Sequence, residues 1–376
     1  MRLNERREFL KFMGKSGLSL GILPFLSACE SLGLNKSSPI APISPSSQDQ
    51  LVLSPGLEWK SVISWNDILN PQQDRFGFNC DYIAFFPTGD NEAILWVNHE
   101  SPNPIFVSNY VHGQKRTKNQ VIAEQKSVGG SLVKIKKTAN GWQYVQNDPV
   151  NRRIDGTQKI HFANGEIVKG QNYAIGTLGN CAGGHTPWGT VITCEENYQD
   201  FYGDNEKIKN SFKKTTTANY QWNKFFAYPP EHYGWCVEVN PVTGHAVKHT
   251  SLGRYAHECA TVTEARDGRI VVYSGDDKND ECIYKLISND QNSIHKGELF
   301  VADTVNGRWL SLDINKQPVL KKYFGNQLEV LTYARFAAHE IGATRLDRPE
   351  DIEIDPNNGD VYITLTNNKP KGNYHG

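Results

Sequence analysis

The chain has 376 residues, with 40 basic and 41 acidic side chains, and its formal net charge at pH 7 is −1. This balance lacks the basic excess that indicates nucleic-acid binding, so nucleic acid is not an expected partner. The seven cysteines include no CxxC pair, which argues against a tetrahedral zinc-finger site.

The first 29 residues are predicted to be an export signal and not part of the fold. Arg6 and Arg7 form a twin-arginine pattern, and a short apolar run follows over residues 17–26. Spanning a bilayer takes ~20 apolar residues, so this run is too short to be a transmembrane helix. Its length is typical of the central region of a signal peptide. The order Leu-Ser-Ala-Cys ending at Cys29 is typical of a lipobox, and an ordinary Tat signal is the alternative. We therefore expect Tat export to the periplasm or cell surface, with membrane attachment only through a lipid on Cys29.

Residues 30–56 are rich in serine and proline. Such a segment cannot bury enough apolar surface to offset the entropy lost on ordering, so it is predicted to be a linker. The remaining domain, residues 57–376, is large for one compact core, which favours a modular architecture.

Short β-like runs separated by turn signals dominate this domain. Asn140-Gly141 lies between the runs 131–136 and 142–145, and this pair is typical of a hairpin with a type I′ turn. The segments 237–244 and 352–359 resemble each other, each with a β run, an Asn-Pro or Asp-Pro turn and a glycine. These patterns predict an all-β fold, a β-propeller, with a pair of β-sandwiches as the alternative. The chain ends just after a β run, so we expect the propeller to stop before its last blade closes.

Polar residues gather where five of these runs give way to turns. The densest segment is 180–196, NCAGGHTPWGTVITCEE, which holds two cysteines, a histidine and two adjacent carboxylates on a backbone bent by glycine and proline. The others are 96–100, 253–258, 273–277 and 345–351. Corresponding loops of successive propeller blades meet at one mouth of the channel, so these side chains can come together. Clustered carboxylates repel one another, and bound cations resolve that repulsion.

The residue types indicate which cations. Oxygen ligands suit calcium, magnesium and iron(III), and a single thiolate among them favours iron. Simpler interpretations stay open: Glu195 and Glu196 as a solvated pair, the two aspartates at 276 and 277 as turn residues, and Cys181 as a buried thiol or half of a disulfide. The cysteines expected in the core or in disulfides are Cys194, Cys236, Cys259 and Cys282.

From residue 77 to 368 the chain resembles the PhoX-type alkaline phosphatases, a family of Tat-exported bacterial enzymes. The matching motifs are WVNHE at 96–100, the whole 180–196 segment, Gly253-Arg254 with His257-Glu258, and Arg348-Pro349-Glu350 with Asp355-Pro356. The resemblance implies a β-propeller with an iron(III) and calcium cluster. It also implies hydrolysis of small phosphate monoesters outside the cytoplasm, with a metal-bound oxo or hydroxide group as the nucleophile.

The resemblance assigns roles to four residues. Cys181 matches the iron-binding cysteine of the family, and Glu258 and Glu350 match metal-binding glutamates. Arg348 matches the arginine that holds the substrate phosphate. From residue type and position we add, as metal ligands or their supports, Asn98, Glu100, Glu195, Glu196 and Asp276.

Two other functions stay open at this point. One is another calcium-dependent propeller hydrolase, such as a lactonase, and the other is a non-catalytic propeller that binds ligands at the cell surface. The protein is expected to be a monomer.

Overall fold

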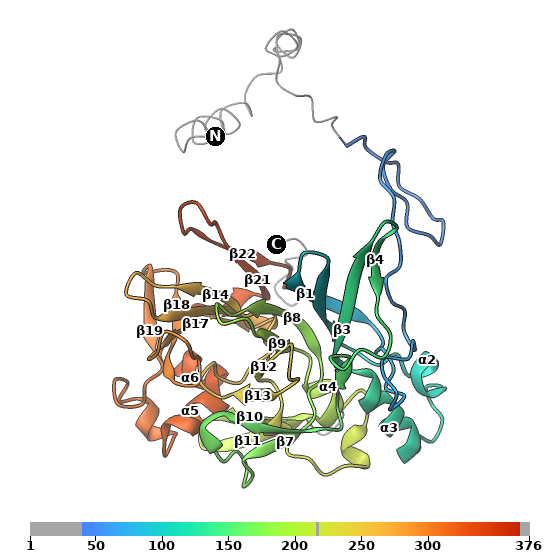
Figure 1. The fold of residues 1–376 in the computed structure, drawn as a ribbon. Coiled ribbons are helices and arrows are strands. Elements are labelled where there is room, and N and C mark those ends of the chain that lie inside the picture. The colour runs from blue at the N-terminus through green and yellow to red at the C-terminus, as the bar shows by residue number, and fades with distance from the viewer. Residues whose placement is uncertain (1–39, 216–217, 369–376) are drawn as a thin grey trace, which may run out of the picture. The chain divides into compact units, whose positions relative to one another are not determined.

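The computed structural model describes residues 40–215 and 218–368 (Figure 1). The chain divides into two units, residues 1–61 and 62–376. In the described part of the first unit, residues 40–61, the chain forms neither helix nor strand, and most side chains are exposed. The predicted signal peptide and lipobox cysteine lie outside the described residues. None of the described helices has the length and hydrophobicity that a membrane crossing requires.

The second unit is mostly β, with a few short helices (Figure 1). Its first sheet has the order β1-β2-β3-β4, with β5 also pairing with β3. The strands are β1 (Cys80–Gly89), β2 (Glu92–His99), β3 (Gly129–Thr138), β4 (Gly141–Tyr144) and β5 (Arg152–Ile154). Between β2 and β3 lie the helices α2 (Pro104–Ser108) and α3 (Lys118–Ser127). The predicted hairpin at residues 131–145 is confirmed as β3-β4. Only Gly141 in its turn takes a positive φ, of 86°, so the turn is not the predicted type I′.

The second sheet has six strands in the order β7-β6-β13-β12-β9-β8, and only β6 and β13 pair in parallel. The strands are β6 (Lys159–Phe162), β7 (Tyr173–Ile175), β8 (Asn180–His185), β9 (Val191–Glu195), β12 (Cys236–Val239) and β13 (Ala246–His249). The 180–196 segment is therefore the β8-β9 hairpin. Cys194 of β9 lies opposite Cys236 of β12, with 3.8 Å between the two sulfur atoms, and both are buried free thiols.

The third sheet has five antiparallel strands in the order β14-β15-β17-β18-β19. They are β14 (Thr261–Glu264), β15 (Ile270–Gly275), β17 (Ile283–Ser288), β18 (Gly297–Asp303) and β19 (Arg308–Ser311). Three two-stranded ribbons accompany it: β10 (Asp204–Ile208) with β11 (Ser211–Thr215), β16 (Asn279–Glu281) with β20 (Leu346–Asp347), and β21 (Pro349–Ile354) with β22 (Val361–Leu365). The remaining helices are α4 (Gln199–Tyr202), α5 (Gln327–Thr332) and α6 (Ala334–Glu340), with 3₁₀ turns at Ala163–Gly165, Trp222–Lys224, Pro230–His232 and Leu320–Lys322.

The two similar segments, 237–244 and 352–359, form the same kind of hairpin. In the first, the Gly244 amide donates to the Asn240 carbonyl, and the Asn240 amide donates to His245. In the second, Gly359 and Asp355 repeat this pattern, with Asp360 as the acceptor. Both glycines take a positive φ, of 71° and 78°, a conformation that glycine adopts without steric cost. The shared motif therefore reflects a shared turn.

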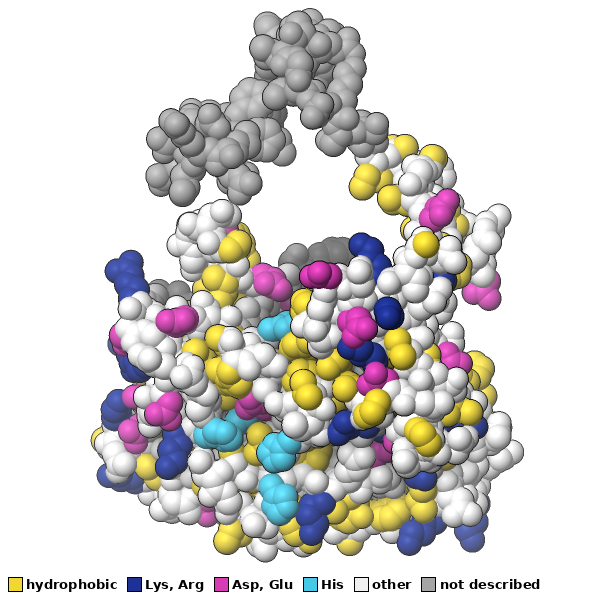
Figure 2. Space-filling model, in the orientation of Figure 1, with side chains coloured by type: hydrophobic (Ala, Val, Ile, Leu, Met, Phe, Trp, Pro, Cys, Tyr) yellow, Lys and Arg dark blue, Asp and Glu magenta, His cyan; other side chains and the backbone are white. Residues whose placement is uncertain are grey.

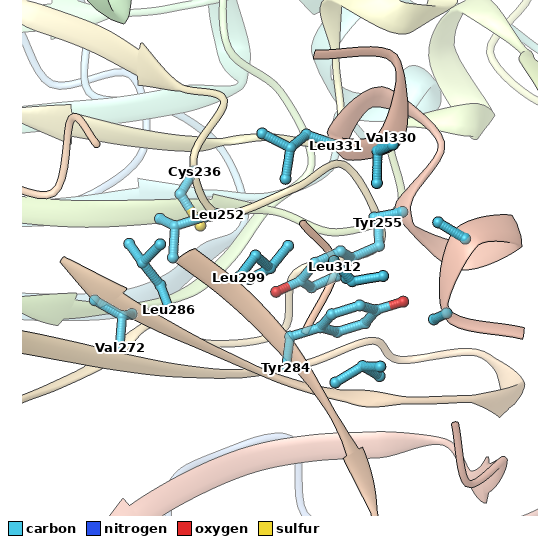
Figure 3. Packing of buried hydrophobic residues seen from close by; sticks show 14 of the residues in the cluster. Cys236, Leu252, Tyr255, Val272, Tyr284, Leu286, Leu299, Leu312, Val330 and Leu331 are labelled. Atoms are coloured by element: carbon cyan, nitrogen blue, oxygen red, sulfur yellow. The ribbon is translucent and has the colours of Figure 1, made fainter. Parts of the chain in front are cut away.

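The largest hydrophobic core joins the second and third sheets and the C-terminal helices (Figure 3). Cys236 of the second sheet packs in one cluster with Val272 and Leu286 of the third. Tyr255 and Tyr284 stack within it, with ring centroids 4.1 Å apart. Burying a large apolar side chain stabilises a fold by about 1.5–3 kcal/mol. This core therefore holds the second and third sheets together. The segments that follow their strands are held in fixed positions as a result.

Basic and acidic side chains are interspersed over the face of the molecule in Figure 2, as the near-zero net charge leads one to expect.

Candidate metal centre

Cys181 lies in β8, where a bulge between Asn180 and Gly183 interrupts the pairing with β9. Its thiol donates to the Glu258 Oε1 atom at 3.3 Å and to the Asp81 Oδ2 atom at 3.6 Å. The Ala182 amide donates to the Glu258 carbonyl at 3.1 Å, which fixes the two segments side by side. At Gly184 a Cβ atom would overlap the Ala260 carbonyl oxygen, so this approach requires glycine.

Four carboxylates from segments far apart in the chain form two overlapping groups, one of which includes this thiol. Glu196 follows β9, Glu258 precedes β14, Asp277 follows β15 and Glu350 lies in β21. The ligand atoms of Cys181, Glu196 and Glu258 lie within 4.8 Å of one another, and so do those of Glu258, Asp277 and Glu350. Glu258 therefore belongs to both groups. We call these five residues the metal-ligand cluster.

Crowding of carboxylates in a buried place changes their protonation. Burial raises the pKa of Glu258 to about 8, with Glu350 and Asp277 adding to the shift. Burial raises the pKa of Glu196 to about 10, and Glu258 and Asp277 contribute again. Burial also raises the pKa of the Cys181 thiol far above its usual range, and the neighbouring carboxylates reinforce this. Without a cation, the cluster holds protons because its anions have too few positive partners.

The cluster fits bound cations by its chemistry. Among the described residues, the Asp277 Oδ1 atom is buried without a hydrogen-bond partner, which is costly unless a ligand satisfies it. The donor atoms of the metal-ligand cluster are carboxylate oxygens and one thiol, a set that suits calcium and iron.

Arg348 brings positive charge to the cluster. Its guanidinium pairs with Asp277 and lies 3.2 Å from the Glu350 Oε1 atom, and a third of the side chain is exposed. Its backbone takes a φ of 53°, a strained value for a residue with a side chain, and such strain concentrates at functional sites. Arg348 also lines a pocket of 480 Å³ together with Glu196, Asn197, Glu206, Asp277, Lys278, Asn279, Glu281 and Arg335.

Asn98 and Glu100 come close to the cluster without joining it. The buried Asn98 amide donates to the carbonyls of Cys181 and Ala182, so it holds the bulged segment in place. Burial and the nearby Asp81 raise the pKa of Glu100, whose carboxylate accepts a hydrogen bond from Asn79.

Glu195 does not join the cluster, because neighbouring residues of an extended chain point to opposite sides. It is fully buried, pairs with Lys248 at 2.6 Å and accepts hydrogen bonds from the amides of Gly234 and Trp235. The carboxylate of the adjacent Glu196 lies in the cluster instead.

Asp276 is also placed elsewhere. Its buried carboxylate accepts two hydrogen bonds from Arg335 of α6, at 2.6 and 2.7 Å, and one from the Ala256 amide. The carboxylate of the adjacent Asp277 lies in the cluster instead. The adjacent aspartates in the sequence indicate that a carboxylate lies in the site, but they do not indicate which of the two it is. Asp81, which accepts a hydrogen bond from the Cys181 thiol, is the second residue of β1. No motif in the sequence indicates its place near the cluster.

A family model described as alkaline phosphatase PhoX matches residues 38–375. The chain belongs to the PhoX alkaline phosphatase family. Among solved structures it is similar to Pseudomonas fluorescens PhoX in complex with vanadate, a transition-state analogue, with 32% sequence identity and a TM-score of 0.73. The match covers 82% of this chain and 64% of that one, so the chain spans less than two thirds of that protein's length. The mostly β architecture agrees with this PhoX structure. No curated protein matches the chain.

Proposed function

We propose that the chain hydrolyses small phosphate monoesters at the metal-ligand cluster, with iron(III) and calcium as its cations. The observation that carries this proposal is the convergence of four carboxylates and one thiol beside Arg348, which lines a pocket together with Glu196 and Asp277 of the cluster. One guanidinium cannot balance this negative charge, so the site favours cations. Membership of the PhoX family supports phosphate esters as the substrates.

Cys181 and Glu258 have definite tasks in this proposal. Cys181 would hold iron through its sulfur, and Glu258, which belongs to both groups, would be shared between cations. Bound cations would offset the charge of the phosphate oxygens and lower the pKa of bound water. Cys181 is unsuited to act as a nucleophile, since burial raises the pKa of its thiol and the reactive form is the thiolate.

Arg348 would bind the phosphate of the substrate. Its forked guanidinium suits two oxygens of one phosphate group. A third of the side chain is exposed, so it can contact a ligand. Asp277 and Glu350 hold the guanidinium in place before the substrate arrives. Such preorganised positive charge stabilises the charge that develops in phosphoryl transfer.

The wider setting also belongs to this proposal. We propose that the sheets are arranged as blades of a β-propeller, and that the protein acts as a monomer after Tat export. The twin-arginine pattern at Arg6 and Arg7 and the lipobox cysteine Cys29 support a periplasmic or membrane-tethered location.

The test is hydrolysis of 4-nitrophenyl phosphate by purified protein supplied with iron(III) and calcium, together with elemental analysis of the folded protein. Arg348→Ala should lower kcat/KM by about 10²-fold or more, whereas Arg345→Ala, an exposed arginine nearby, should leave it unchanged. Activity with calcium but no bound iron would point to another calcium-dependent hydrolase. Absence of turnover would leave a binding module.

A further inference from the structure

The pocket around Arg348 continues away from the metal-ligand cluster. A second hollow of 180 Å³ shares Glu206, Glu281 and Arg335 with it. The second hollow runs between β10, α5 and α6, where Lys207, Tyr333 and Phe336 line it. A substrate whose phosphate lies at Arg348 would therefore extend its leaving group into this space, which we call the leaving-group groove.

Most charged side chains along the groove already have partners. Arg335 pairs with Asp276 at 2.6 Å, and Arg254 pairs with Asp204 at the same distance. His339 lies 3.0 Å from the Glu281 carboxylate, and Lys213 lies 3.9 Å from the Glu206 carboxylate. These pairs leave little free charge for a ligand to meet.

Lys278 is different. It lines the pocket beside Asp277, is only partly exposed, and has no ion-pair partner within 4.0 Å in the part of the chain that the structure describes. A partly buried ammonium group that makes no direct ion pair is stabilised when an anion comes into contact with it. Because Lys278 lines the pocket, a substrate bound there can bring this anion to it.

The surroundings of Lys278 indicate which part of a substrate it would meet. Lys278 lines the pocket at Arg348 together with Glu206, Glu281 and Arg335, the three residues that this pocket shares with the leaving-group groove. Glu206 lies in β10 and Arg335 in α6, and none of the three belongs to the metal-ligand cluster. Lys278 therefore lines the pocket from which the groove continues, where a substrate bound at Arg348 would extend its leaving group.

We infer that Lys278 selects phosphate monoesters whose leaving group carries a second anionic group, a carboxylate or another phosphate. This inference rests on the proposed phosphatase function. Lys207 adds positive charge at the far end of the same groove, where it packs against the rings of Phe212, Phe324 and Tyr333. Lys278 is thus a specificity-determining residue, separate from Arg348 and from the cation ligands.

The test compares two esters of the same shape, phenyl phosphate and 4-carboxyphenyl phosphate. The ratio of kcat/KM for the carboxylated ester to that for phenyl phosphate isolates the second anion. Lys278→Met should lower this ratio by roughly tenfold, the size expected for a lost hydrogen bond to a charged group. Lys278→Arg should largely retain it. As a matched control, Lys285→Met removes another partly buried lysine, one that packs on Trp309 outside the groove, and should leave the ratio unchanged.

The inference is overturned if Lys278→Met leaves the ratio unchanged, including the case in which both esters slow equally. Calorimetric binding of the same two esters to the metal-loaded protein gives the same ratio without turnover. If the wild-type chain hydrolyses neither ester, the proposed phosphatase function fails, and the binding ratio still decides the role of Lys278.

Discussion

The Sγ atom of Cys181 lies 3.3 Å from the Oε1 atom of Glu258, although 77 positions separate the two residues in the chain. A backbone hydrogen bond from the next residue, Ala182, to the Glu258 carbonyl joins the same two segments. The contact between the side chains therefore depends on the fold and not on an attraction between a thiol and a carboxyl group. Changes to the Cys181 side chain should alter the chemistry of the site more than its structure.

Cys181→Ser should abolish any iron–thiolate absorption and most phosphatase activity, since a hydroxyl oxygen replaces the only thiolate of the cluster. The backbone hydrogen bond stays, so the melting temperature of the metal-free protein should change little. Visible spectroscopy, calorimetry and turnover of 4-nitrophenyl phosphate check this. The exposed Cys80 provides the control, because Cys80→Ser should change none of the three. An unaltered spectrum of metal-loaded Cys181→Ser would remove Cys181 from the iron ligands.

The adjacent aspartates 276 and 277 should respond differently to the same substitution. Asp277→Asn removes a ligand charge from the cluster, so bound metal and activity should fall while the metal-free fold keeps its stability. Asp276→Asn leaves the largely buried guanidinium of Arg335 without its counter-charge, which should cost about 3 kcal/mol of stability. Metal content and urea denaturation distinguish the two. Equal loss of metal in both variants would contradict the division of roles.

Lys248→Met should be among the most destabilising single changes in the chain. Lys248 and Glu195 have side chains that are 0% exposed and pair at 2.6 Å, so the substitution leaves a buried carboxylate unpaired, at a cost of about 3–5 kcal/mol. Replacing both residues, as Glu195→Gln with Lys248→Met, should recover much of that loss. Chemical denaturation measures the free energies of unfolding. A double variant no more stable than the single one would show that the pair is not the cause.

The stability of the metal-free protein should fall as the pH rises. Burial raises the pKa of Glu258 from 4.5 to about 8 and that of Glu196 to about 10. A carboxyl group with a higher pKa in the folded chain stabilises the fold fully below its unfolded pKa, and this stabilisation disappears as the pH rises through the folded value.

The window for that loss therefore runs from about pH 4.5 to about 8 for Glu258, and Glu196 extends it toward 10. Bound cations favour the deprotonated form, so loading with iron and calcium should flatten the dependence. Melting temperatures of chelated and metal-loaded protein between about pH 5 and 9 test this. Identical pH profiles for the two forms would contradict it.

The sequence allowed much of the local structure to be predicted. The hairpin at residues 131–145 and the paired turns at Asn240 and Asp355 are predicted from turn chemistry, and the structure confirms all three, although the turn of the first hairpin is not of type I′. The Cys181 and Glu258 segments could be singled out because residue types that bind metals gather in them. Their contact could not be derived from local patterns, since it depends on how the second and third sheets pack.

Adjacent carboxylates show where prediction from the sequence ends. Glu195 and Glu196 have the same chemistry, and only the direction of each side chain decides which one faces the metal-ligand cluster. The same holds for the aspartates at 276 and 277. In both pairs the second residue faces the cluster, because the first pairs with a cation, Lys248 or Arg335, on the other side. Those cations come from distant segments that have no recognisable relation to the pairs in the sequence.

The turn after β15 places three different requirements on three consecutive residues. Asp276 anchors α6 through Arg335, Asp277 faces the cluster, and Lys278 lines the pocket. Insertion or deletion of one residue here would shift all three side chains together and exchange their directions. Natural or engineered variation in leaving-group preference should therefore come from substitution at Lys278 and not from a change in the length of this turn.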